Sequence, residues 1–329
     1  MDPVKSQRLY KWDNIKGILI TLVVVGHFIE PYLEVSDIYS SIWIFIYTFH
    51  MPLFIFAAGF FHSNKNIRSK VTYYLFLYVL MTVLLFAFDR MLGFDIRLHL
   101  LNNDGTPWFM LLMAFCTAIT YLLRDCPQAL VLVTVFLVGI NSGYDPAIGD
   151  MLCLSRLFVF YPFYYMGYCL KLSKKEELSA RCNTGVRVLS AAGILVWFAL
   201  CLVRLDQIYL LRPFFTGRNS FEASAIPVEG GLIRILCYIL SIAMCALIIF
   251  CMTDKPIPLL SIMGTRTIQI YFCHRFIRDL LQCADIETFL RQGAMFKILW
   301  LILAMAVAAA LSVKALGKPF DALRKACNR

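Results

Sequence analysis

The chain reads Ile15-Lys16-Gly17-Ile18-Leu19-Ile20-Thr21-Leu22-Val23-Val24-Val25-Gly26-His27 near its N-terminus, and this stretch decides the fold class. It is apolar enough to form most of a membrane-spanning helix, which needs about 20 mostly apolar residues. A second such stretch is Ile42-Trp43-Ile44-Phe45-Ile46-Tyr47-Thr48-Phe49-His50-Met51-Pro52-Leu53-Phe54. An ionisable side chain in hydrocarbon is costly, so by default it faces a cavity or a partner. His27 and His50 are therefore candidate site residues, because histidine also transfers protons near neutral pH.

The whole chain has the composition of a membrane protein. Of its 329 residues, 60% are hydrophobic and 16% are charged, whereas a soluble protein has roughly 25% charged residues. We expect an all-α, polytopic membrane helix bundle of about ten transmembrane helices, a single domain over residues 1–329 in a plasma or inner membrane. The ten predicted spans are centred near Val23, Thr48, Val79, Phe115, Val135, Pro162, Ile194, Ser241, Phe272 and Ala306.

The net charge of +10 has two interpretations. It could indicate nucleic-acid binding, but an excess of Lys and Arg in the cytoplasmic loops of a membrane protein is the simpler explanation. With ten spans, the distribution of these residues predicts that both termini are cytoplasmic. Two predicted outer segments, 89–106 and 204–234, are unusually rich in charge for loops of their length.

The twelve cysteines predict neither a disulfide framework nor a metal site. Most lie singly in apolar runs, as Cys116 and Cys245 do, and the sequence has no CxxC pair or zinc-like Cys/His spacing. We expect buried core cysteines, no metal and no permanently bound cofactor.

Helix geometry relates the two histidines to each other. His27 would lie about 18 Å from the cytoplasmic boundary and His50 about 14 Å from the outer one, at 1.5 Å per residue. In a hydrocarbon core of about 30 Å these depths coincide, so the rings could meet across one cavity. Lys16 and Asp13 share a helix face with His27, which suits binding of an anionic ligand at the cytoplasmic mouth. The alternatives are a snorkelling Lys16 that marks orientation and histidines with only structural roles.

Four later residues are weaker candidates. His274 lies in a weakly apolar segment and could line an interior or only end a helix. Arg156 and Tyr161 lie in a segment with four tyrosines and Pro162, which suggests a kinked, cavity-lining helix. Aromatic packing is the alternative for any one of these tyrosines. Trp108 is expected at the outer boundary, where an aromatic belt residue would also be found.

Taken in order, these residues resemble the membrane-bound acyltransferase-3 family, and within it the branch similar to fucose 4-O-acetylase. The resemblance covers nearly the whole chain, and its first two motifs together are specific. The motifs are Asp13-x-x-Lys16-Gly17-Ile18 running to Val25-Gly26-His27, Phe49-His50-Met51-Pro52-Leu53-Phe54 with Gly59-Phe60-Phe61, Pro107-Trp108-Phe109, Phe160-Tyr161-Pro162-Phe163 through Gly167-Tyr168, and Ile270-Tyr271-Phe272-Cys273-His274.

The resemblance implies about ten spans, an acyl-CoA donor in the cytoplasm, and a carbohydrate acceptor at or beyond the membrane. Much of the family has arginine where this chain has Lys16, which keeps the charge but lacks the bidentate fork. The implied partners are acyl-CoA, most simply acetyl-CoA, a carbohydrate or lipid-linked sugar, and membrane lipids, with no nucleic acid.

These features predict an acyl-CoA-dependent O-acyltransferase that modifies an envelope or exported polysaccharide. His27 would be the general base, and His50 would orient the acceptor or stabilise the oxyanion. Lys16, with Asp13, would bind the CoA phosphates. The acceptor path would be lined by Arg156, Tyr161, Trp108 and His274.

Two other classes of function stay open. A secondary transporter of a polar solute would also use intramembrane His and Arg residues, although the two halves have no recognisable repeat or matched pair of broken helices. A non-catalytic membrane sensor or scaffold would require the histidines to be dispensable. Consumption of acetyl-CoA is the observation that separates the enzyme from both.

Overall fold

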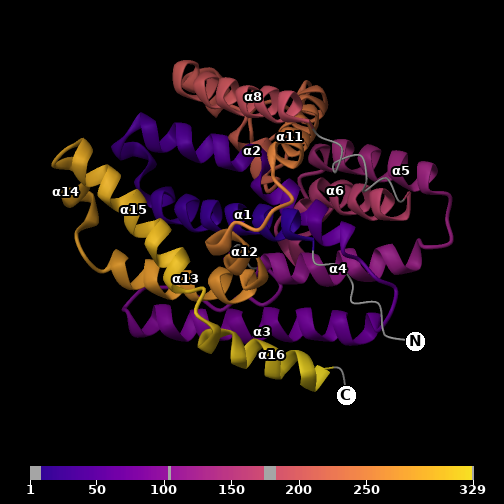
Figure 1. Ribbon diagram of the computed structural model, residues 1–329, viewed down its shortest axis with the longest axis horizontal. Helices are drawn as coiled ribbons and strands as arrows, with labels where there is room; N and C mark the ends of the chain where they lie inside the picture. Colours follow the sequence, from indigo (N-terminus) through magenta and orange to yellow (C-terminus); the bar gives the residue numbers. More distant parts are fainter. Residues whose placement is uncertain (1–8, 103–104, 174–182, 328–329) are drawn as a thin grey trace.

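The computed structural model describes residues 9–102, 105–173 and 183–327, and this part of the chain is helical without a strand (Figure 1). The helices follow the chain in this order: α1 Tyr10–Ile29, η1 Glu30–Val35, α2 Asp37–Phe60, α3 Ile67–Met91, α4 Trp108–Leu122, α5 Gln128–Asn141, η2 Ser142–Tyr144, η3 Met151–Cys153, α6 Leu154–Leu172, α8 Thr184–Val203, α9 Leu205–Tyr209, α10 Arg212–Thr216, α11 Gly230–Cys251, α12 Pro258–Thr265, α13 Thr267–Gln282, α14 Ile286–Arg291, α15 Ala294–Ala310 and α16 Lys314–Cys327.

The predicted all-α membrane bundle is confirmed in its class. Each of the ten predicted centres lies in a separate helix: α1 to α6, α8, α11, α13 and α15. Five helical segments of the described chain are long and apolar enough to cross a membrane, and a sixth is possible if α15 and α16, bent by 55°, form one span. Helices α4 and α5 are apolar but shorter, and α6, although 19 residues long, is not among the helices apolar enough to cross. Ten spans and cytoplasmic termini therefore stay predictions.

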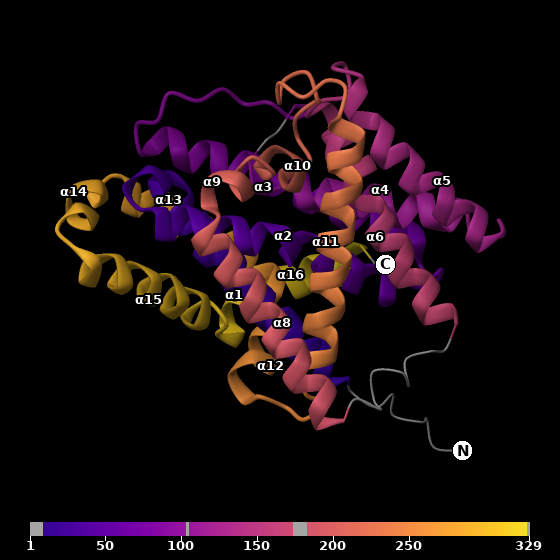
Figure 2. The ribbon, with the colours of Figure 1, turned by 90° about the horizontal axis from the view of Figure 1, so that it is seen from above.

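Helices α1 and α2 form the centre of the molecule (Figures 1 and 2). The apolar window of α2 is 72% buried, and that of the segment Tyr10–Val35 is 56% buried, whereas that of α8 is only 11% buried. Helix α8 lies at an edge and packs mainly on α11 and α2. The two histidine-bearing stretches are therefore surrounded by protein, as an intramembrane polar site requires.

Glycines let α1 and α12 approach each other closely. A Cβ on Gly17 would lie 2.2 Å from the carbonyl oxygen of Leu260, and one on Gly264 would lie 1.8 Å from that of Asp13. Small residues at such crossings allow the backbones of membrane helices to pack together. Helix α12 is thereby held against the first turns of α1, which contain Asp13.

We expect Gly264→Ala to destabilise the protein by about 1–3 kcal/mol, because the new methyl group would force the α1 and α12 backbones apart. Thermal unfolding of the purified protein in detergent measures this effect. Gly149→Ala is the matched control, since a Cβ there meets nothing within 4 Å. Equal stability of the two variants would contradict the close-packing interpretation.

The segments predicted to be cytoplasmic share one face of the molecule. The ammonium group of Lys16 lies 5.4 Å from the ring centre of Phe61, which follows α2. The hydroxyl of Ser69, near the start of α3, donates to the carbonyl oxygen of Cys327, at the end of α16 (2.6 Å). The start of α1, the α2–α3 connection and the end of α16 therefore lie together. The C-terminal end of α1, which carries His27, points away from this face.

Candidate active site

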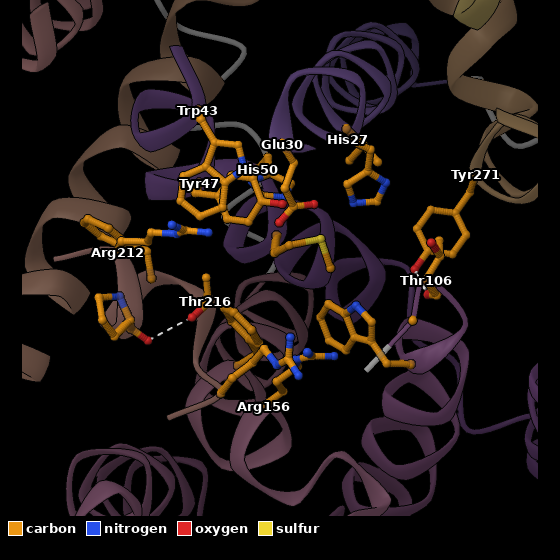
Figure 3. A pocket seen from close by; sticks show the side chains of 18 of the residues that line it. His27, Glu30, Trp43, Tyr47, His50, Thr106, Arg156, Arg212, Thr216 and Tyr271 are labelled. Atoms are coloured by element: carbon orange, nitrogen blue, oxygen red, sulfur yellow. Dashed lines mark hydrogen bonds between the residues drawn. The ribbon is translucent and has the colours of Figure 1, made fainter. Parts of the chain in front are cut away.

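A cavity of about 390 Å³ lies at the C-terminal end of α1 (Figure 3). Its volume is within the range of small-molecule sites, about 300–1,000 Å³. Helices α1, α2, α4, α6, α10 and α13 contribute to it, together with η1, residues 105–106 and the residues that follow α10. The lining residues are Val23, His27, Glu30, Trp43, Tyr47, His50, Met51, Gly105, Thr106, Trp108, Arg156, Phe160, Arg212, Pro213, Phe215, Thr216, Arg218, Asn219, Tyr271, Arg275 and Arg278.

The two predicted histidines both line this cavity, but the hydrogen-bond partner of His27 is a third histidine. Nδ1 of His27 is 2.9 Å from Nε2 of His274, and the two rings are stacked with their centres 5.1 Å apart. His274 is fully buried on α13. The rings of His27 and His50 thus share one cavity, as the helix depths suggested, but the direct contact of His27 is with His274 on α13. His274 itself is absent from the cavity lining, so it does not line an acceptor path as predicted.

The hydrogen bonds determine where the protons of this histidine pair reside. Nδ1 of His274 lies 2.9 Å from the carbonyl oxygen of Ile270. A carbonyl oxygen only accepts, so Nδ1 of His274 carries the proton and its Nε2 is the acceptor in the neutral ring. His27 must then donate from Nδ1, which leaves its own Nε2 with a free lone pair. In the neutral pair, His274 thus orients His27 with its basic nitrogen available to the cavity.

His50 is held in the same tautomer by its own helix. Its Nδ1 lies 2.8 Å from the carbonyl oxygen of Ile46, so this nitrogen donates and Nε2 is unprotonated in the neutral ring. Neutral His50 therefore offers a hydrogen-bond acceptor and no second N–H. Oxyanion stabilisation, one of the two roles expected for it, would require the charged imidazolium. Orientation of an acceptor hydroxyl fits the neutral ring.

Two of the weaker candidates meet at the opposite wall of the cavity. The guanidinium carbon of Arg156 lies 4.5 Å from the ring centre of Trp108. Arg156 is buried, with Nη2 3.6 Å from a carboxylate oxygen of Asp150. Both residues line the cavity, and their assignment to an acceptor path stays a prediction.

Tyr161 does not lie where the sequence predicted. It is absent from the cavity lining, and its hydroxyl is 3.1 Å from the hydroxyl of Thr120. Position 161 lies one residue beyond Phe160, which does line the cavity, so the helical turn directs Tyr161 toward α4. The aromatic packing alternative describes Tyr161 better.

Lys16 and Asp13 lie outside the cavity, as expected for a site at the other end of α1. Nζ of Lys16 is 3.0 Å from a carboxylate oxygen of Asp13, and the Lys16 side chain is 25% exposed. The intervening Asn14 is fully buried, and its amide donates to the carbonyl of Lys255 at 2.8 Å. Asn14 accepts from the Ser261 hydroxyl at 2.6 Å. Asn14 therefore holds the start of α12 against α1. Lys16 is the residue of this motif that remains as a candidate for binding a ligand.

Several residues that line the cavity are not among those predicted from the sequence. Glu30 lies three residues after His27, on the same helical face, and this spacing could have identified it. Arg212 and Arg218 belong to the charge-rich segment 204–234, which was singled out only as a whole. Tyr47 lies three residues before His50, and its ring centre is 4.6 Å from that of His50. Residues 103–104 of the other charge-rich segment lie outside the described residues.

No metal centre is present among the described residues: no group of three or more His, Cys, Asp or Glu side chains is placed to bind an ion. The described cysteines are free, and most are buried or half-buried.

Apolar helices around a buried, histidine-containing cavity define an integral membrane protein with an enzyme-like site. The acyltransferase-3 family, described as an acyltransferase domain, matches residues 9–315. The chain belongs to this family, and it is a multi-pass membrane acyltransferase.

The chain is also similar to two curated proteins. Nodulation protein NolL of Sinorhizobium fredii (strain NBRC 101917 / NGR234) is 25% identical over 222 residues, which cover 61% of this chain and 58% of that protein. Nodulation protein NolL of Mesorhizobium japonicum (strain LMG 29417 / CECT 9101 / MAFF 303099) is 37% identical over 70 residues, which cover 20% of this chain and 19% of that protein. The alignments thus span less than two thirds of either relative. No solved structure matches the chain.

Proposed function

We propose that this protein transfers an acyl group, most simply acetyl, from cytoplasmic acyl-CoA to a carbohydrate hydroxyl of an envelope or exported glycan. The observation that carries the proposal is the His27–His274 hydrogen bond of 2.9 Å, which orients a basic nitrogen at a cavity large enough for a sugar. Family membership supplies the reaction class. The donor, the acceptor and the location in a plasma or inner membrane are parts of the proposal.

The proposed reaction follows from the tautomers. Nε2 of His27 accepts the proton of the acceptor hydroxyl while the hydroxyl oxygen attacks the thioester carbonyl. The new ester forms, the C–S bond breaks, and the proton on His27 passes to the CoA thiolate. Nδ1 of His27 remains hydrogen-bonded to His274 throughout, so the ring keeps its orientation. The lone pair of His50 would accept from a second sugar hydroxyl and align the first with His27.

Glu30 would add a further contact to the acceptor. It lines the cavity beside His27, and no ion pair joins its carboxylate to any residue in the described ranges. Carboxylate oxygens accept hydrogen bonds from vicinal sugar hydroxyls, and such charge-assisted bonds are stronger than neutral ones. An acid in this position therefore favours a polyhydroxylated acceptor.

The donor phosphates would bind at the other end of α1. Lys16 lies eleven residues before His27, roughly 16 Å along the helix. In this arrangement the pantetheine arm of CoA would run along α1 and bring the thioester to His27. The ion pair with Asp13 orients the Lys16 ammonium group, which is only partly exposed.

We expect Lys16→Gln to raise the KM for acetyl-CoA by roughly 10-fold or more, because one charge-assisted contact to phosphate is lost. The KM for the acceptor should change little. Lys16→Arg should retain most of the affinity. Steady-state kinetics with each substrate varied in turn measures both constants. A Lys16→Gln enzyme with an unchanged KM for acetyl-CoA would contradict this assignment and favour the snorkelling interpretation.

The proposal is tested with membrane vesicles that contain the protein, supplied with acetyl-CoA carrying a labelled acetyl group. Label should appear in carbohydrate and stay bound as an alkali-labile ester. Solute export is measured in parallel, because a transporter would move solute without consuming acetyl-CoA. Comparison of surface glycans from cells with and without the gene by mass spectrometry then identifies the acylated sugar. Absence of acetyl-CoA-dependent labelling in the first assay would overturn the proposal.

A further inference from the structure

The cavity is strongly cationic. Among the residues that the structure describes, five arginines line it, against one acid, Glu30. Three of the five have a close carboxylate partner outside the lining. Arg218 lies 2.6 Å from Asp150, Arg275 lies 2.9 Å from Asp279, and Arg278 lies 2.5 Å from Asp279. Arg275 also lies 3.9 Å from Asp89, so three carboxylates lie near these three arginines. The remaining two, Arg156 and Arg212, are paired less completely.

Arg156 is the first cation without adequate partners. Its relative exposure is 4%, and its Nη1 has no hydrogen-bond partner within residues 9–102, 105–173 and 183–327. The nearest carboxylate oxygen, on Asp150, is 3.6 Å from Nη2, and Asp150 is already held by Arg218. The Trp108 ring covers the face of the guanidinium group, which leaves its in-plane donors free. A buried cation with unmatched donors is costly unless a ligand supplies the missing charge.

Arg212, on the α10 side of the cavity, is the second arginine without adequate partners. Its guanidinium carbon lies 4.8 Å from the ring centre of Trp43, and its Nη1 donates to the Tyr209 hydroxyl at 2.9 Å. No described carboxylate forms an ion pair with it, Glu30 included. Figure 3 shows the guanidinium groups of Arg212 and Arg156 both directed into the space beneath His27 and His50.

We propose that Arg156 and Arg212 bind an anionic group, a phosphate or a carboxylate, that belongs to the acceptor sugar. The proposal rests on the proposed function and names its substrate class: an anionic carbohydrate that places a hydroxyl at His27 while its charged group lies between the two arginines. Planar guanidinium groups suit this task, because they donate in pairs to the oxygens of carboxylates and phosphates.

The two arginines serve the acceptor and not CoA because of their position. Both line the cavity beyond His27, whereas the proposed CoA phosphate site at Lys16 is at the opposite end of α1. With the CoA phosphates at Lys16 and the charged group of the acceptor at Arg156 and Arg212, the donor and the acceptor would extend from His27 to opposite sides. The anionic acceptor also resolves the unmatched donors of Arg156, which a neutral sugar hydroxyl would satisfy only in part.

The test measures binding and needs no acyl donor. The full chain is purified into nanodiscs and titrated with three probes: a hexose 1-phosphate, a hexuronate and the corresponding neutral methyl hexoside. At least one anionic probe should bind more tightly than the neutral one. Arg212→Gln and Arg156→Gln should each weaken its binding by about 10-fold to 100-fold, the loss expected for a charge-assisted hydrogen bond. Arg156→Lys should lie between wild type and Arg156→Gln.

Arg291→Gln is the matched control, because Arg291 is exposed on α14 and pairs with Glu287. It should bind the probes as wild type does. The two anionic probes distinguish phosphate from carboxylate. Equal binding of the neutral probe, no binding of any probe, or wild-type affinity in Arg212→Gln would overturn the proposal. Thermal unfolding without a probe identifies a variant that fails to fold. If Arg156→Gln fails to fold, Arg212→Gln still tests the proposal, because Arg212 is partly exposed.

Failure of this inference is distinguishable from failure of the proposed function. Arginine-dependent binding without acyl transfer to any acceptor would leave the anion site intact and remove the reaction. Acyl transfer to neutral sugars alone, unaffected by the arginine substitutions, would retain the reaction and remove the anion site. A weakened affinity for acetyl-CoA in place of the anionic sugar would assign the two arginines to the donor.

Discussion

His27→Ala should reduce acyl transfer by about 10²–10⁴-fold, the range expected when a general base is removed. The reason is specific to the hydrogen bonds of the site. Nδ1 of His27 is engaged by His274, so Nε2 is the ring nitrogen that can accept the proton of the acceptor hydroxyl. Steady-state acetyl transfer from labelled acetyl-CoA measures the effect. Most of it should fall on kcat, because both substrates still have their binding residues.

His99→Ala is the control for this experiment. His99 is an exposed histidine outside the cavity around His27, so its removal should leave the rate unchanged. Membrane insertion and thermal stability of both variants are checked beside activity. Full activity in a folded His27→Ala protein would remove His27 from the chemistry. It would also make His50, the other lining histidine with a free lone pair, the leading candidate for the base.

His274→Leu should lower kcat by roughly 10²-fold, while the KM values for both substrates change little. Leucine fills the space but cannot accept from His27, whose ring is then free to rotate and to change tautomer. A small misplacement of a catalytic group is enough for a loss of this size. In the proposed reaction His274 would act through His27, as a positioning residue.

His274→Gln separates positioning from packing. Its amide oxygen can accept from Nδ1 of His27 in place of the imidazole nitrogen, so this variant should recover much of the activity lost in His274→Leu. The two variants are compared by kcat and by thermal unfolding. Equal losses in kcat, at equal stability, would mean that the acceptor at this position has no influence on His27. If the loss in kcat follows only the loss in thermal stability, His274 has a packing role in the core.

The helical class and the first two site residues follow from local sequence. A run of apolar residues as long as the one that ends at His27 must span a membrane or be fully buried, and this depends only on its length and composition. The two histidines stand out because the cost of an ionisable group in hydrocarbon is also a local property. The family resemblance suggested a reaction class for these two residues. The match over residues 9–315 confirms the acyltransferase family.

The partners of these residues could not be predicted from local sequence. His274 is 247 positions from His27. Arg212 lies in the charge-rich segment 204–234, whose sequence does not show which of its arginines faces the cavity. Which side of a helix faces which neighbour depends on how the helices cross. In this protein, glycines such as Gly264 help to set the crossing by allowing the backbones to touch. Tyr161 was misplaced for this reason, since one residue along α6 turns a side chain by about 100°.

The sequence alone determined that the protein is a helical membrane protein with ionisable residues in its core, because hydropathy and the cost of buried charge act over short stretches of chain. The tertiary structure alone decided which histidine orients His27 and which nitrogen is left basic. It also decided that Arg156 and Arg212 face one space. Those properties depend on hydrogen bonds and contacts between distant helices, and they exist only once α1, α2, α6, α10 and α13 are packed together.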